Sequence, residues 1–213
     1  VFQSMSHLPP PESSQNQTEP HPPESPDPWA PYEPPGGILV WIIVVVELLT
    51  FLAGIGVFLY QRAGDPEAFT RGRDLLSQPL ALLNTAILLT GGWFMVCSLT
   101  ELRKGMREKS LRWIAATIAS GLAFLAVKVV EYTGKIEQGH VFGEDTFFTL
   151  YYALTGFHFI HVAVAVLILL YFAKQIRLGR YHRDHHDDVE AGGIFWHLCD
   201  LIWLFLFPTL YLL

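Results

Sequence analysis

Five long apolar stretches limit most strongly how this 213-residue chain can fold. They cover residues 37–60, 80–99, 111–132, 147–172 and 194–213, and short polar segments separate them. A helix needs about 20 consecutive, mostly apolar residues to cross the hydrocarbon core of a bilayer. The sequence therefore predicts an all-α polytopic membrane protein, a bundle of five transmembrane helices without a second globular domain.

The first 36 residues have a composition that cannot form a packed core. They contain eleven of the fourteen prolines and no lysine or arginine. This predicts a disordered, Pro-rich tail at 1–36 ahead of one membrane domain at 37–213. The tail also lacks the basic region of a secretory signal, so we expect the first apolar stretch to remain in the mature protein, with Met5 as a candidate initiator.

The distribution of lysine and arginine predicts an orientation. The side of the membrane that holds the N-terminal tail carries nine of these residues, in the segments 103–112 and 174–183, whereas the opposite side carries four. Cytoplasmic loops are enriched in lysine and arginine. We therefore expect the N-terminus in the cytoplasm and the C-terminus outside it.

Ionisable side chains lie inside the apolar stretches, where an unpaired charge is unfavourable. Glu47 lies about 15 Å along the first predicted helix, near the bilayer midplane. We interpret it either as a proton-handling carboxyl or as a neutral acid that donates a hydrogen bond to a neighbouring helix. Lys128 and Glu131 are one helical turn apart, and this spacing favours an internal ion pair.

Three histidines and one aspartate occupy the last two stretches. His158 and His161 share a face of one helix, and His197 and Asp200 share a face of the next. Histidines on facing helices can ligate a b-type haem, but hydrogen bonding between helices, with Asp200 accepting from an imidazole, is the favoured interpretation. The ligands suit neither a di-iron nor a zinc site, so no metal or cofactor is expected in this chain.

The loop before the last stretch is rich in histidine and acidic residues. It suits either a metal-binding tract or, as we favour, a cytoplasmic loop that contacts lipid headgroups. The residues expected to contact headgroups are His182, His185, His186 and Glu190. We find no catalytic motif and no basic cluster with interleaved aromatics, so nothing supports a self-contained enzyme or binding to nucleic acid.

Small residues predict where helices pack closely. They recur every four positions in the third stretch and occur in pairs in the first two. These positions are Ala115, Ala119, Ala123, Gly54, Gly56, Gly91 and Gly92. Tryptophans and several tyrosines near the ends of the stretches are expected to anchor the chain at the membrane interface. These tryptophans are Trp41, Trp93, Trp113 and Trp196.

The most specific motifs lie in the last two stretches. The strings FFTLYYALTGFHFIHVAVAVLILL at 147–170 and EAGGIFWHLCDLIWLFLFPTLYLL at 190–213 resemble the closing helices of the cytochrome c oxidase subunit III family. The earlier strings GILVWIIVVVELLTF, LNTAILLTGG and FLAVKVVEY agree with that family in the same order. The resemblance covers about residues 36–213.

The resemblance implies an accessory subunit in a bacterial inner membrane, with its C-terminus in the periplasm. Its partner would be the haem-bearing catalytic subunit of a haem–copper oxidoreductase, which would hold the haem and the copper or non-haem iron. The chain would stabilise that subunit and assist proton uptake, and loop residues of this family help to hold phospholipid in a cleft. Glu47 falls on the family's carbodiimide-reactive glutamate. The other positions that match polar positions of the family are Glu131, His158, His161, His197 and Asp200.

The number of helices separates this chain from part of the family. Mitochondrial-type members have seven helices, whereas five-helix members occur in quinol oxidases and as NorE-type subunits encoded with nitric oxide reductases. The FLYQRAGDPEAF segment and the FPTLYLL ending resemble the NorE-type branch most. The alternatives are a proton-coupled carrier, a b-haem membrane protein and a purely structural scaffold. The carrier is disfavoured because five helices give no inverted repeat.

Overall fold

The computed structural model describes residues 37–183 and 186–213, so the tail predicted at 1–36 lies outside the described residues. Five of its helices are long and apolar enough to cross a membrane: α1 (Gly37–Gly64), α3 (Gln78–Arg103), α4 (Arg107–Glu137), α5 (Thr146–Arg177) and α6 (Asp187–Tyr211). The predicted all-α fold with five spans is confirmed, and the chain is a multi-pass membrane protein. Each helix is longer than its apolar stretch because it continues into polar flanking residues.

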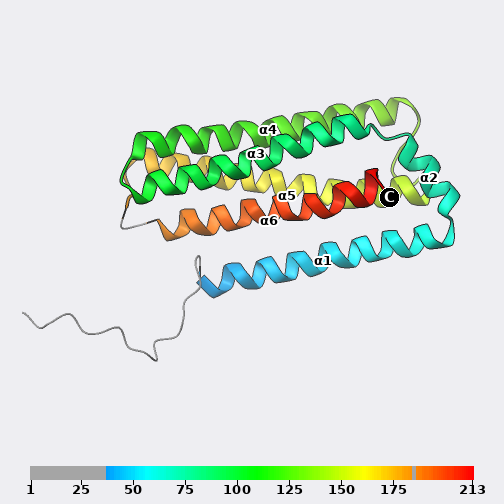
Figure 1. Ribbon diagram of the computed structural model, residues 1–213, viewed down its shortest axis with the longest axis horizontal. Helices are drawn as coiled ribbons and strands as arrows, with labels where there is room; N and C mark the ends of the chain where they lie inside the picture. The colour runs from blue at the N-terminus through cyan, green and yellow to red at the C-terminus, as the bar shows by residue number, and fades with distance from the viewer. Residues whose placement is uncertain (1–36, 184–185) are drawn as a thin grey trace, which may run out of the picture. The chain divides into compact units, whose positions relative to one another are not determined.

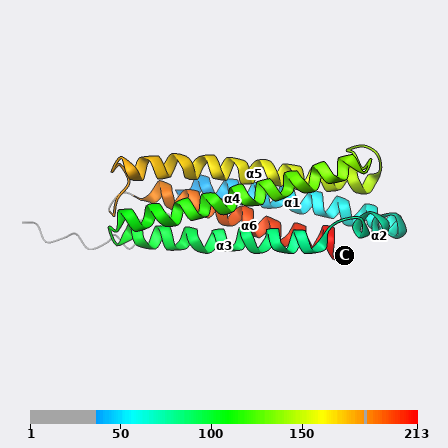
Figure 2. The ribbon, with the colours of Figure 1, turned by 90° about the horizontal axis from the view of Figure 1, so that it is seen from above.

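Four of the spans form a bundle, and the fifth lies against its side. Helices α3, α4, α5 and α6 pack in sequence around a common core, and α6 closes the ring against α3 (Figures 1 and 2). Helix α1 contacts α5 and α6 from outside this ring. Its buried side chains are Phe51, Ile55 and Phe58, all beyond its first half. The N-terminal half of α1 is therefore loosely packed.

A short helix that hydropathy does not predict, α2 (Pro66–Asp74), follows α1. Asp65 caps its N-terminus, since Oδ1 accepts a hydrogen bond from the Ala68 amide at 3.0 Å, and a proline occupies the first turn. Phe69 of α2 packs edge-on against Phe58 of α1 and Phe147 of α5. Helix α2 thus covers the end of the bundle at which the C-terminus lies (Figure 1).

Glycines, rather than alanines, produce the closest approaches inside the ring. Trp196 is fully buried, and a Cβ at Gly91 of α3 or Gly121 of α4 would lie within 3.0 Å of its ring. The predicted interfacial position of Trp196 is therefore wrong, because these two glycines leave room for the indole in the core. The alanine prediction is also wrong, since Ala115 and Ala119 are exposed on the outer surface of α4.

The two ends of the bundle differ in basic residues, as the sequence predicts. The start of α1, the α3–α4 turn and the α5–α6 loop lie at one end, and α2, the α4–α5 loop and the C-terminus lie at the other (Figure 1). Arg103 at the end of α3 donates to Glu190 in the first turn of α6, with Nη2–Oε1 at 2.7 Å. The topology therefore collects the nine basic loop residues on one side, and the cellular side that this end faces remains a prediction.

Candidate functional site

A buried polar cluster joins α4, α5 and α6 in the half of the bundle nearer the C-terminus. Lys128 Nζ donates to Glu131 Oε2 at 2.8 Å, to Tyr211 Oη at 3.0 Å and to Tyr151 Oη at 3.1 Å. Tyr211 Oη in turn donates to Glu131 Oε1 at 2.8 Å. The ion pair that the spacing of Lys128 and Glu131 predicts is present, and all three ammonium protons have acceptors.

This cluster is sealed from the surroundings of the protein. The side chains of Lys128 and Glu131 are 1% and 3% exposed. The ring centroids of Tyr132 and Tyr151 lie 4.7 and 5.0 Å from Lys128 Nζ, within the range of cation–π attraction. Both carboxylate oxygens of Glu131 accept hydrogen bonds, so the cluster offers no open position for a substrate or an ion.

A second polar contact joins α1 to α5 near the middle of the bundle. Glu47 Oε2 lies 3.1 Å from His161 Nε2, although the two do not meet with the direction of a normal hydrogen bond. His161 Nδ1 is 2.8 Å from the Phe157 carbonyl oxygen, so the proton belongs on Nδ1 and donates to that carbonyl. The remaining nitrogen of His161 is then basic. The pair is an acid and a base that can share one exchangeable proton.

His158, one turn before His161, has a different environment. It is fully buried, and the rings of Phe124 and Trp203 lie 5.6 and 5.3 Å from its own. Neither of its ring nitrogens has a hydrogen-bond partner among the described residues. The shared face that the sequence predicts therefore places one histidine against a carboxylate and the other inside an aromatic cage.

His197 and Asp200 form a pair on α6 that faces α3. His197 Nδ1 lies 3.4 Å from Asp200 Oδ2, and the side chain of His197 is 44% exposed. Phe195 is the α6 residue that stacks on His161, with ring centroids 6.3 Å apart. Residues two apart on a helix point about 200° from each other, so His197 points away from His161.

The haem interpretation of these histidines is therefore disfavoured by geometry. Two axial ligands must present their free nitrogens to each other, whereas His161 turns its basic nitrogen towards Glu47 and His197 pairs with Asp200. In the part of the chain that the structure describes, no group of three or more His, Cys, Asp or Glu side chains is placed to hold a metal ion.

The histidine-rich loop is linked to the start of α6. Glu190 Oε1 lies 2.9 Å from His186 Nε2 and also accepts from Arg103, so this carboxylate ties the loop to α3. His182 is exposed in the loop, and His185 lies outside the described residues. The three acidic residues in the first turn of α6 stand where the helix dipole favours negative charge.

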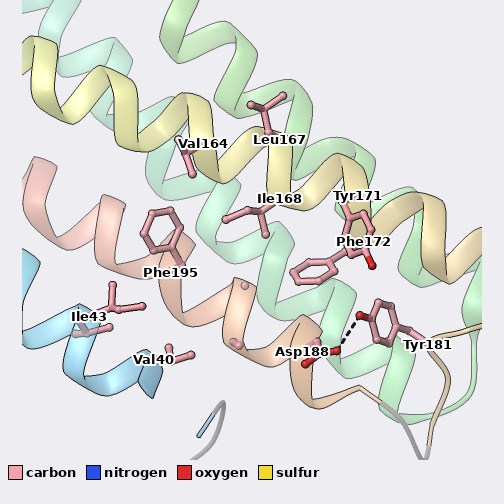
Figure 3. Close-up of a pocket in the computed structure, with 13 residues that line it drawn as sticks. Val40, Ile43, Val164, Leu167, Ile168, Tyr171, Phe172, Tyr181, Asp188 and Phe195 are labelled. Atoms are coloured by element: carbon pink, nitrogen blue, oxygen red, sulfur yellow. Dashed lines mark hydrogen bonds between the residues drawn. The ribbon is translucent and has the colours of Figure 1, made fainter. Parts of the chain in front are cut away.

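An apolar groove separates the N-terminal half of α1 from α5 and α6 (Figure 3). Its volume is about 750 Å³, and Val40, Ile43, Ile168 and Phe195 are among the residues that line it. At one end, Tyr181 Oη donates to Asp188 Oδ2 at 2.8 Å.

One end of the groove carries polar groups. Partial burial, followed by the hydrogen bond to Asp188, raises the pKa of Tyr181 to about 12, so its hydroxyl remains a neutral donor at physiological pH. At the other end, Phe195 stacks on His161, next to Glu47. The groove therefore has a polar mouth, and Phe195 of its apolar wall separates it from His161.

Sequence reasoning missed the tyrosines that complete the Lys128 cluster. Tyr151 and Tyr211 lie at helix positions that are distant in the chain, and nothing in their spacing relates them to Lys128. A physical argument could have indicated that such acceptors exist. A lysine inside an apolar helix needs three acceptors, and one glutamate cannot supply all of them.

Comparison with known proteins agrees with the sequence motifs. A family model described as cytochrome c oxidase subunit III matches residues 73–213. Subunit 3 of the cytochrome bo(3) ubiquinol oxidase of Pseudomonas aeruginosa is 25% identical over 176 residues, which cover 81% of this chain and 82% of the relative. Cytochrome c oxidase subunit 3 of Synechocystis sp. is 31% identical over 82% of this chain and 74% of the relative. The subunit 3 of Alkalihalophilus pseudofirmus is 27% identical over 81% and 84% of the two chains.

Proposed function

Since this chain belongs to the cytochrome c oxidase subunit III family, we propose that it is an accessory subunit of a haem–copper oxidoreductase in a bacterial inner membrane. It would pack against the haem-bearing catalytic subunit and stabilise that subunit's metal site during turnover. The haem, with copper or non-haem iron, would belong to the partner. The match over residues 73–213 is the observation that carries this proposal.

A role in proton uptake is supported by the Glu47–His161 contact. An acid and a base 3.1 Å apart can pass one proton between them while the pair as a whole stays neutral, which suits a step in a proton route through the membrane. With the N-terminus in the cytoplasm, as the basic loops favour, the groove opens towards the cytoplasmic side. The C-terminus would then lie in the periplasm.

Phospholipid is the second partner that we propose. The groove is lined mostly by aliphatic and aromatic side chains, which suits an acyl chain. Its mouth, with Tyr181 and Asp188, lies beside the loop that carries His182 and His186. These side chains are placed to meet a headgroup, and Glu190, which contacts both Arg103 and His186, links this loop to α3.

The branch of the family decides which acceptor the complex reduces. The segment 58–69 and the closing FPTLYLL favour the NorE-type branch, in which the partner would be a nitric oxide reductase. The relatives described above are named as oxidase subunits, which favours oxygen. The identity of the haem-bearing partner distinguishes these two possibilities.

The experiment that tests the function is purification of the tagged chain from its native membrane in mild detergent. We expect a redox difference spectrum with haem bands, and mass spectrometry is expected to identify a large catalytic partner. The haem type and the partner sequence then separate oxidase from nitric oxide reductase. A haem-free chain that elutes alone would contradict the proposal and favour an independent carrier.

A further inference from the structure

One intramembrane imidazole points outward from the bundle. His197 lies ten residues after Asp187, the first residue of α6, which is about 15 Å along the helix axis. Its side chain is 44% exposed, whereas His158 and His161 are buried. Hydrocarbon solvates an imidazole poorly, so a half-exposed histidine at this depth indicates a polar group outside the chain.

The carboxylate beside it is incompletely paired. Asp200 is 6% exposed, and its Oδ1 atom is buried without a hydrogen-bond partner among the described residues. Its Oδ2 atom lies so close to α3 that a Cβ at Gly92 would overlap with it. At Gly92, helix α3 therefore offers no side chain to this carboxylate. One oxygen of Asp200 and the Nε2 atom of His197 make no hydrogen bond within the described part of the chain.

Apolar side chains flank this pair on both helices. We call the surface formed by Leu89 and Val96 of α3 and by His197, Leu201 and Leu204 of α6 the α3/α6 face. Its four aliphatic residues are each between 41% and 49% exposed. Helix α1 does not cover it, because α1 packs against α5 and against the opposite side of α6, where Phe195 lies. The α3/α6 face is thus an apolar surface with a hydrogen-bonding centre.

The α4/α5 side of the bundle provides a surface for comparison. Leu122 and Val129 on α4 are exposed there, and both are aliphatic. A purely aliphatic surface is satisfied by lipid chains. A surface that carries a half-exposed imidazole is better satisfied by a protein that supplies a hydrogen-bonding group at the same depth.

We propose that a transmembrane helix of the haem-bearing catalytic subunit docks on the α3/α6 face. A hydroxyl or amide side chain of that helix forms a hydrogen bond with the outward-facing imidazole of His197, and the buried Asp200 contacts this imidazole from within the chain. The flanking leucines and the valine pack against its apolar side chains. This inference rests on the proposed function, because it needs the catalytic subunit as the partner.

The test places a photo-crosslinking amino acid at Leu89 or Leu204 in the tagged chain, expressed with its complex in the native membrane. Leu122 and Val129 are the matched control positions on the α4/α5 side. We expect adducts with the catalytic subunit from Leu89 and Leu204 and lipid adducts from the controls. Adducts with the catalytic subunit from the controls alone, or only lipid adducts or a second copy of this chain at Leu89 and Leu204, would overturn the inference. If no haem-bearing subunit co-purifies even with the unmodified chain, it is the proposed function that fails.

A second measurement addresses His197 directly. We expect His197→Leu to retain the catalytic subunit about threefold to tenfold less well as detergent is increased, the effect of losing one intramembrane hydrogen bond. His197→Gln, which keeps a hydrogen-bonding group, is expected to retain most of it. Thermal unfolding of each isolated variant shows whether the fold is intact. Equal retention by His197→Leu and the unmodified chain would mean that the partner does not engage this imidazole.

Discussion

Two groups of intramembrane polar residues in this protein differ in how completely they are paired. Around Lys128 and Glu131, the ammonium donates three hydrogen bonds and both carboxylate oxygens accept within the chain. Around Glu47, His158 and Asp200, buried polar atoms lack hydrogen-bond partners among the described residues. The first group is complete by itself, whereas the second needs a proton, a water molecule or a partner.

This difference distinguishes polar residues that hold membrane helices together from polar residues that serve another role. A fully satisfied buried network fixes how helices pack, and it loses stability as soon as one member is removed. An incompletely paired group lowers stability in the isolated chain, so its presence favours a role outside folding. The comparison therefore predicts opposite responses to substitution in the two groups.

The largest effect is expected in the Lys128 group. Glu131→Leu leaves a buried ammonium that keeps only the two tyrosine hydroxyls as acceptors, and we expect a loss of about 3–5 kcal/mol of unfolding free energy. The double variant Lys128→Leu with Glu131→Leu removes both charges and is expected to recover most of that loss. Unfolding in mixed detergent micelles measures both values. A single variant as stable as the unmodified chain would show that the network does not hold the helices together.

A smaller loss is expected where α3 approaches Asp200. The Cβ of Gly92→Ala would overlap with Asp200 Oδ2, so the buried carboxylate must shift, and we expect a loss of about 1–3 kcal/mol of unfolding free energy. Gly156→Ala on α5 is the control, because no atom lies within 4 Å of the place that the new Cβ would take. There the lower helix propensity of glycine predicts a gain of about 0.5–1 kcal/mol. Equal effects at the two positions would contradict the close contact.

Glu47 is expected to affect turnover much more than stability. Its carboxylate makes no regular hydrogen bond, so Glu47→Gln should change the unfolding free energy by less than about 1 kcal/mol. If the pair with His161 handles protons, the same variant shortens the active lifetime of the catalytic subunit during turnover. The matched control is Glu67→Gln, an exposed acid on α2. Unchanged assembly, lifetime and proton pumping in Glu47→Gln would leave Glu47 with a packing role only.

The five spans could be predicted from sequence because hydropathy depends only on composition over about 20 residues. Hydropathy could not predict which side of each helix faces the core and which side faces lipid. In a soluble bundle the buried stripe is apolar and the exposed stripe polar, but here lipid-facing and core-facing residues are both apolar. This explains why Trp196 was expected at the interface and why Ala115 and Ala119 were expected inside. The short helix α2 did have a local signal, the Asp65–Pro66 cap, which a search for apolar stretches passes over.

The residues of the candidate site could be predicted from the sequence, but the contacts between residues of different helices could not. Spacing along one helix identified the Lys128–Glu131 pair correctly, because both residues belong to α4. It could not join Glu47 to His161, since that contact depends on how α1 packs against α5. Spacing also could not predict that His158 and His161 meet different neighbours, since the two residues share one helix face.

The smallest effect is expected at His158, and it tests how the second group is satisfied. The imidazole lies in an aromatic cage with neither nitrogen paired, so His158→Phe replaces it by an apolar ring of similar shape. Removing two unsatisfied polar atoms is expected to leave stability unchanged or to raise it by about 1 kcal/mol. Thermal unfolding of the isolated chain measures this, with His158→Ala as the control that leaves a cavity. A clear loss in His158→Phe would mean that a buried water molecule completes the hydrogen bonds of this histidine, and the contrast with the Lys128 group would then narrow to Glu47 and Asp200.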